Sequence, residues 1–166
     1  MFSSKNKIKV SDLAELLYIT TVDSNYINNM IDKLKNEVNT LDSSRVYREL
    51  IVLRLIIVAN LIRSDKLFKS RYEKKVLLYL EYLNHFKENE KEIKKEYSLI
   101  DLAKSRMKIY IPSIERDNIY CVLEIAPIFV NYCGVNGSEA FIKKIKTFYL
   151  NDTLAFAELL RKYRLY

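Results

Sequence analysis

The sequence predicts an α+β protein, in which an N-terminal five-helix bundle is followed by a small β-rich C-terminal domain. Residues 1–111 contain no glycine and no proline. Such a stretch favours helices, because nothing in it interrupts the i to i−4 hydrogen bonds. Residues 117–166 hold both glycines and one of the two prolines, which is typical of short strands joined by turns. We therefore expect a helical domain over 1–108, a linker over 109–117 and a β-rich domain over 118–166.

Five helices are expected in the N-terminal part, because apolar residues recur there at helical spacing. A side-chain oxygen just before a helix can accept hydrogen bonds from the free N–H groups of its first turn. Such caps are available at Asp23 or Ser24 for the second helix, and at Asp42 or Ser43 for the third. The expected helices cover approximately residues 11–18, 24–38, 43–63, 66–87 and 92–109.

The C-terminal part is predicted to alternate between the two faces of a sheet. A proline inside a helix costs about 3 kcal/mol or more, so Pro127 is placed at a bulge between two strands. Phe129 and Val130 follow it, and strand geometry would point them to opposite faces. The predicted elements are strands at 120–125, 128–132 and 143–150, a turn at 134–137, a helix capped by Asn151 or Asp152, and a last strand at 164–166.

The chain is basic, and its basic residues gather in the middle. It has 28 Lys and Arg residues against 21 Asp and Glu residues, giving a formal net charge of +7. A charge of this sign is compatible with nucleic acid or with an acidic protein partner. The predicted basic patch consists of Arg63, Lys66, Lys69, Arg71, Lys74 and Lys75.

Nothing in the sequence indicates catalysis, a cofactor or a metal. The single histidine, His85, is expected to be structural or superficial, and Cys121 and Cys133 are expected to be thiols of the core. No cluster has metal-ligand spacing and no glycine-rich phosphate loop is present. The apolar run 50–62 is short of the ~20 residues that a membrane span needs. We expect a non-enzymatic and cytoplasmic protein.

Two further features leave alternatives open. Arg54 is a lone charge within the apolar run, and a buried charge needs a partner. That partner would come from another helix or another subunit, unless Arg54 extends from the edge of the core into water. The two short helices before residue 38 are also compatible with a helix-turn-helix that reads DNA through asparagines, or with ordinary helix packing.

The C-terminal stretch resembles the small β domain of the GINS family. Val122, Leu123, Pro127, Phe129 and Val130 match its pattern of V-L-x-x-hydrophobic-P-x-F-V. Gly137 matches the following turn. FIKKIKTFYL resembles the next strand, and LAFAELLRKYRLY resembles the closing helix and strand. RVYRELIVLRLIIVANLIRS is similar, more loosely, to the long helix of the family's helical domain. The order of the two domains is that of the archaeal-type subunit.

This resemblance implies a nucleoid-associated scaffolding subunit for DNA replication, without enzymatic activity. The subunit would join a second GINS subunit in a hetero-tetramer and contact the MCM helicase, a RecJ-like protein of the Cdc-type helicase-activating class, and primase. The interface residues implied are Pro127, Phe129, Val130 and Arg54. The alternative is a stand-alone, basic helical protein that binds nucleic acid through the stretch 63–75. Salt discriminates between them, because electrostatic binding to nucleic acid weakens steeply as salt rises.

Overall fold

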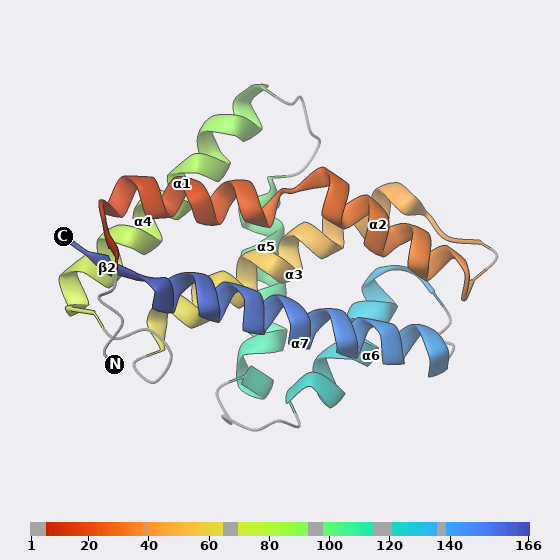
Figure 1. The fold of residues 1–166 in the computed structure, drawn as a ribbon. Coiled ribbons are helices and arrows are strands. Elements are labelled where there is room, and N and C mark those ends of the chain that lie inside the picture. Colours follow the sequence, from red (N-terminus) through yellow and green to blue (C-terminus); the bar gives the residue numbers. More distant parts are fainter. Residues whose placement is uncertain (1–5, 39, 65–69, 93–97, 115–120, 136–138) are drawn as a thin grey trace.

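The computed structural model describes residues 6–38, 40–64, 70–92, 98–114, 121–135 and 139–166 (Figure 1). Most of these residues are helical. The helices are α1 (Val10–Thr21), α2 (Ser24–Lys35), α3 (Ser43–Arg63), α4 (Tyr72–Glu92), α5 (Leu99–Ile114), α6 (Cys121–Tyr132) and α7 (Glu139–Lys162). Two short strands, β1 (Asn6–Ile8) and β2 (Tyr163–Leu165), lie near the two ends of the chain.

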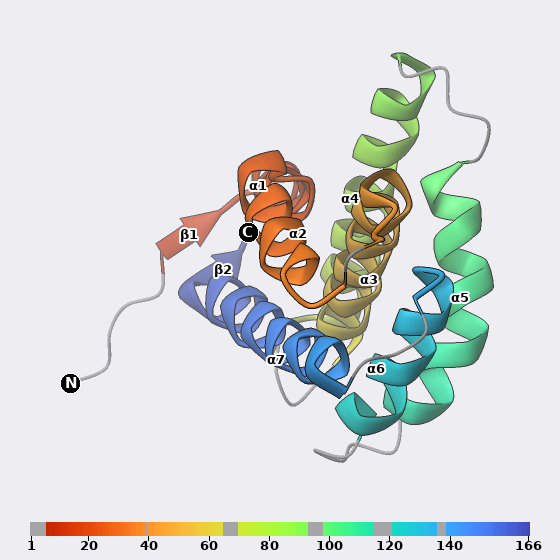
Figure 2. The same ribbon diagram turned by 90° about the vertical axis from the view of Figure 1, so that its right-hand side faces the viewer.

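Helix α3 is the centre of the fold. It contacts α1, α2, α4, α5 and α7, and Figure 2 shows it between α1, α2 and α7 on one side and α5 and α6 on the other. Every residue from Glu49 to Ala59 is buried. A helix that is apolar on all sides is stable only when other elements surround it. The apolar run 50–62 is therefore a core helix, and no helix among the described residues is long and apolar enough to span a membrane.

The N-terminal helices follow the sequence prediction closely. The carboxylate of Asp23 accepts hydrogen bonds from the backbone N–H groups of Asn25 and Tyr26, at 3.0 and 3.1 Å. Asp42 accepts one from the backbone of Arg45 at 3.0 Å. These bonds satisfy donors that a helix leaves free in its first turn, and they confirm the predicted caps of α2 and α3.

The later helices begin further along the chain than predicted. The predicted helix at 66–87 corresponds to α4, which begins at Tyr72, and residues 65–69 lie outside the described part. The predicted helix at 92–109 corresponds to α5, which begins at Leu99, and residues 93–97 are likewise outside it. Residues 109–114 of the predicted linker continue α5, whereas 115–117 are not among the described residues.

The prediction of a β-rich C-terminal domain is wrong. Residues 121–132 form α6 and residues 139–162 form α7, so the described part contains neither the strand at 128–132 nor the strand at 143–150. Both helices pack on the N-terminal ones: α6 contacts α5, and α7 contacts α3 and α2. One hydrophobic core accordingly includes residues from both predicted domains.

Pro127 lies inside α6 rather than at a bulge. Its ring is exposed, so the missing hydrogen bond falls on the side of the helix that water can reach. On the other side, Ile125, Phe129 and Cys133 recur every four residues and are buried together with Ala126 and Val130. Burying one large apolar side chain contributes about 1.5–3 kcal/mol. Several such side chains offset the cost of one proline.

The same periodicity explains α7. Its buried residues are Phe141, Ile145, Phe148, Tyr149, Asp152, Phe156, Ala157 and Leu160. They repeat every three or four positions, as one face of a helix does. Neither Asn151 nor Asp152 caps a helix, because both lie in the interior of α7.

The last predicted strand exists, one residue earlier than expected, and it pairs with an unpredicted strand. β2 runs parallel to β1, with Asn6 opposite Tyr163 and Ile8 opposite Leu165. The backbone N–H of Tyr166 adds a hydrogen bond to the Ile8 carbonyl at 3.3 Å. Among the described residues, the sheet has these two strands. It joins the segment before α1 to the segment after α7 (Figure 1).

Candidate functional site

Arg54 finds its partner on another helix, as one of the two alternatives predicted. Its Nε lies 3.3 Å from Oδ2 of Asp152 on α7, and each side chain is 4% exposed. Nη1 donates to the Thr21 carbonyl at 3.2 Å, and the guanidinium lies 4.5 Å from the centre of the Tyr26 ring. The alternative in which Arg54 reaches from the core edge into water is wrong.

The surroundings of this pair make it a structural feature. Burial raises the pKa of Asp152, although the charge of Arg54 and the hydrogen bond from the Tyr26 hydroxyl act in the opposite direction. Burial and the Asp152 charge together raise the pKa of Tyr26 to about 12. The pair therefore couples α3 to α7 through desolvated charges, and its position in the core leaves it little contact with water.

The interface residues implied by the resemblance do not form a common surface. Phe129 and Val130 are both buried, because neighbouring residues of a helix can share its inner stripe, so the prediction of opposite faces is wrong. Pro127 is exposed on α6, and Arg54 is buried on α3.

The predicted basic patch is divided between free and engaged side chains. Arg63 and Arg71 are exposed. Lys74 donates to the Leu165 carbonyl at 3.0 Å, and Lys75 is buried and donates to the Ser64 carbonyl at 3.3 Å. Lys66 and Lys69 lie outside the described residues. Only part of the patch is available to a ligand.

A pocket lies where the end of α3 meets the beginning of α4. We call it the α3–α4 pocket; it is lined by Ile62, Arg63, Tyr72, Lys75, Val76 and Tyr79 and has a volume of about 370 Å³. Pockets that hold small ligands typically have volumes of about 300–1,000 Å³. The pocket combines two cations with two tyrosines, and no carboxylate is among the described residues that line it.

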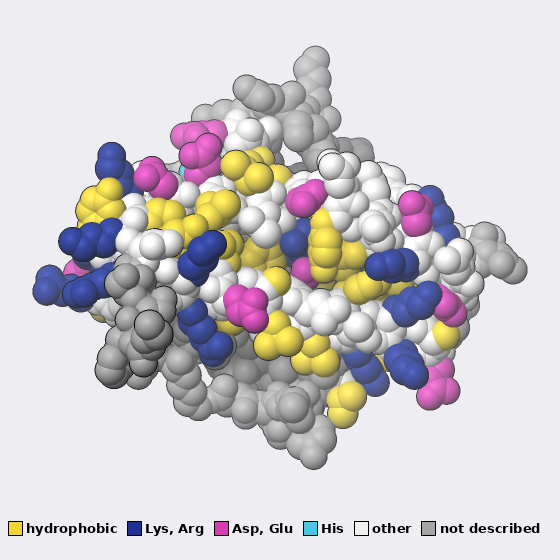
Figure 3. Space-filling view, viewed as in Figure 1, with side chains coloured by type: hydrophobic (Ala, Val, Ile, Leu, Met, Phe, Trp, Pro, Cys, Tyr) yellow, Lys and Arg dark blue, Asp and Glu magenta, His cyan; other side chains and the backbone are white. Residues whose placement is uncertain are grey.

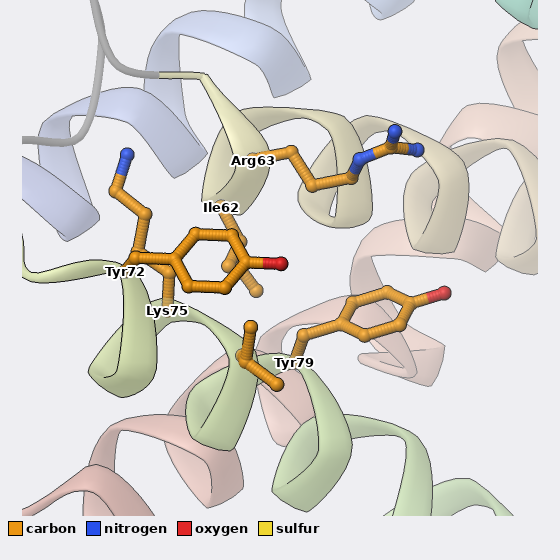
Figure 4. Close-up of a pocket in the computed structure, with 6 residues that line it drawn as sticks. Ile62, Arg63, Tyr72, Lys75 and Tyr79 are labelled. Atoms are coloured by element: carbon orange, nitrogen blue, oxygen red, sulfur yellow. The ribbon is translucent and has the colours of Figure 1, made fainter.

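Tyr72 is the most accessible of the lining residues. It is 78% exposed, and Figure 4 shows its ring close to the side chain of Lys75 and to the stem of Arg63, whose guanidinium extends away from the ring. Val76 follows Tyr72 by one helical turn, and Tyr79 by two. The predicted basic patch includes Lys75 but neither tyrosine. The sequence signal for the pocket is the placement of tyrosines at helical spacing among basic residues.

Elsewhere the described surface is mixed. On the face formed by α1, α2 and α7, basic and acidic side chains are interspersed with apolar ones (Figure 3). Asn25, Asn28, Asn29 and Asn36 line a shallow depression on α2 together with Asp32 and Lys33. Although α1 and α2 are two consecutive short helices, α2 packs on α3 and α7. Asp32 places negative charge beside the asparagines that a DNA-reading helix would use.

The remaining polar candidates are structural. His85 stacks on Tyr18, with ring centres 5.6 Å apart. Cys133 is a buried free thiol, and burial raises its pKa. Cys121 belongs to α6. Among the described residues, no group of three His, Cys, Asp or Glu side chains could hold a metal ion.

Comparisons with family models, curated proteins and solved structures find no match to this chain.

Proposed function

We propose that the protein binds single-stranded nucleic acid, with the α3–α4 pocket receiving a base. The observation that carries the proposal is the exposed ring of Tyr72 beside Arg63 and Lys75, in a pocket with no carboxylate among its described lining residues. Proteins that bind single strands combine an aromatic surface for the bases with positive charge for the phosphates. A duplex keeps its bases stacked and offers no free base face to Tyr72.

The charges around the pocket fit this role. Arg63 makes no hydrogen bond or ion pair with a described residue, so its five N–H donors are free to meet phosphate oxygens. Arg71 is exposed at the beginning of α4. Lys75 contributes charge from the pocket wall while it holds the Ser64 carbonyl. The net charge of +7 adds a general attraction to a polyanion.

The GINS assembly and its helicase and primase partners stay predictions of the resemblance alone, and we do not adopt them. The matched C-terminal motif was expected to form a separate β domain, whereas residues 122–130 belong to α6 and FIKKIKTFYL belongs to α7, and Phe129 and Val130 lie in the shared core.

The test is the binding of a fluorescently labelled single-stranded oligonucleotide, followed by anisotropy at increasing salt. We expect the logarithm of the association constant to fall linearly with the logarithm of salt concentration, because bound phosphates release counterions. Replacing Tyr72 with alanine removes the stacking surface. Stacking on an aromatic ring contributes about 1–3 kcal/mol per base, so the affinity should fall roughly five- to 150-fold.

Matched controls separate stacking from general effects. Tyr72→Phe keeps the ring and should bind nearly as well as the wild type. Leu123→Ala removes an exposed apolar side chain of α6, which belongs to neither α3 nor α4, and should leave the affinity unchanged. Arg63→Gln should weaken binding and reduce its salt dependence, whereas Arg161→Gln on α7 should do neither. Equal affinities for the wild type and Tyr72→Ala would overturn the proposal.

A further inference from the structure

A second cavity lies at the opposite end of α3. We call it the arginine cavity; it is lined by Asp42, Arg45, Arg48, Glu49, Leu102 and Arg106 and has a volume of about 420 Å³. Arg45 precedes Arg63 by 18 positions in the same helix, and a helix rises about 1.5 Å per residue. The arginine cavity is therefore roughly 27 Å from the α3–α4 pocket and shares no lining residue with it.

The two carboxylates of the cavity are already engaged. Both oxygens of Glu49 accept hydrogen bonds from Arg106, at 2.9 and 3.2 Å. This fork-to-fork geometry is the strongest that an arginine and a carboxylate can make. The guanidinium of Arg106 also lies 3.4 Å from the centre of the Tyr132 ring. Asp42 uses its Oδ1 atom to cap α3, so neither carboxylate pairs with the other two arginines.

Arg48 is left with unused donors. It is half-buried, and its Nε atom is inaccessible to water and has no hydrogen-bond partner among the described residues. Because water does not reach Nε, a ligand in the cavity would meet the terminal nitrogens of Arg48, which make no hydrogen bond with a described residue. Arg48 also makes no ion pair with a described residue.

Arg45 is held in place from the other side of the cavity. Its Nε donates to the Tyr132 carbonyl at the end of α6. Gly134 follows with a φ of +72°, and a Cβ at that position would lie 2.8 Å from Arg45 Nη1. The glycine thus leaves room for the guanidinium. The terminal nitrogens of Arg45 still have free N–H donors, because one arginine carries five N–H groups and the Tyr132 carbonyl accepts only the Nε–H.

We propose that the arginine cavity binds an oxoanion of the phosphate class, held between Arg45 and Arg48. Two guanidinium groups offer more N–H donors than the two oxygens of a carboxylate can accept, whereas phosphate has more oxygens and more negative charge. The Glu49–Arg106 pair also lines the cavity, beside Arg45 and Arg48. This site is independent of nucleic-acid binding at the α3–α4 pocket, since the two share no residue.

The test is a titration of the full-length protein with inorganic phosphate, followed through the arginine Nε–H signals in NMR spectra. The reference titrations use sodium chloride and sodium acetate at equal ionic strength. We expect phosphate to shift the Arg48 signal in a saturable manner, while chloride and acetate produce only small, non-saturable changes. A titration with methyl phosphate shows whether the site takes free phosphate alone or also a phosphomonoester.

Variants identify the residues that bind. Arg48→Gln and Arg45→Gln should each lower the phosphate affinity about tenfold or more, because each removes charge-assisted hydrogen bonds. Arg48→Lys keeps the charge without the planar fork and should show an intermediate loss. Arg161→Gln, which removes an exposed arginine of α7, should bind like the wild type.

Two results would overturn this inference. One is a wild-type response to phosphate equal to that for chloride at the same ionic strength, which needs no variant. The other is an unchanged phosphate affinity in folded Arg48→Gln protein, with folding checked by circular dichroism. Tyr72→Ala should leave phosphate binding intact, so failure of the nucleic-acid proposal and failure of this one give different results.

Discussion

Removing the carboxylate of Asp152 should destabilise the protein severely, because it leaves Arg54 as an unpaired buried charge. Both side chains are 4% exposed, and the ion pair joins α3 to α7. Breaking such a buried pair from one side costs about 3–5 kcal/mol. Typical domains have a total stability of about 5–15 kcal/mol, so Asp152→Ala should lose a large part of it.

The assay is urea unfolding followed by helical circular dichroism, with free energies extrapolated to zero urea. Two controls isolate the cause. Asp101→Ala removes an ion pair with Lys104 whose side chains are 74% and 67% exposed, and such surface pairs contribute about 0–1 kcal/mol. The double replacement Arg54→Met with Asp152→Leu removes both charges, and it should recover most of the loss because no buried charge remains. A cost below about 1 kcal/mol for Asp152→Ala would refute the reasoning from burial.

Two further predictions concern the fold. Phe129→Ala should cost about 3–5 kcal/mol and lower the helical signal of the whole chain in one transition, because Phe129 belongs to the shared core; an independent C-terminal transition would contradict this. Pro127→Ala should raise the urea midpoint, since the exposed proline lacks an N–H that alanine supplies to α6, with an upper limit of about 3 kcal/mol; a lower midpoint would indicate the bulge instead.

The sequence determined the N-terminal helices because their signals are local. Asp23 and Asp42 cap helices through bonds to residues two or three positions away, and such contacts can be anticipated from spacing. The C-terminal prediction failed because the cost of a proline inside a helix argues for strands at Pro127, whereas the four-residue spacing of Ile125, Phe129 and Cys133 indicates a helix. Burial of that stripe is a tertiary effect, and it outweighs the local cost of proline.

The candidate sites also depend on tertiary contacts that local sequence patterns do not show. The need of Arg54 for a partner followed from its apolar neighbours. Asp152 was not identified as that partner, because the sequence predicted it to be a helix cap. The α3–α4 pocket is assembled from the ends of two helices. The charges of Arg63 and Lys75 were therefore visible in the sequence, whereas the place of Tyr72 beside them was not.

The most direct test of the proposed function compares a single-stranded oligonucleotide with an abasic strand of equal length and equal charge. If a base stacks on Tyr72, the wild type should bind the complete strand roughly five- to 150-fold more tightly, corresponding to about 1–3 kcal/mol. Tyr72→Ala should reduce this difference, while both strands keep their attraction to the basic side chains. Equal wild-type affinities for the two strands would contradict the proposal, because binding would then depend on phosphate charge alone.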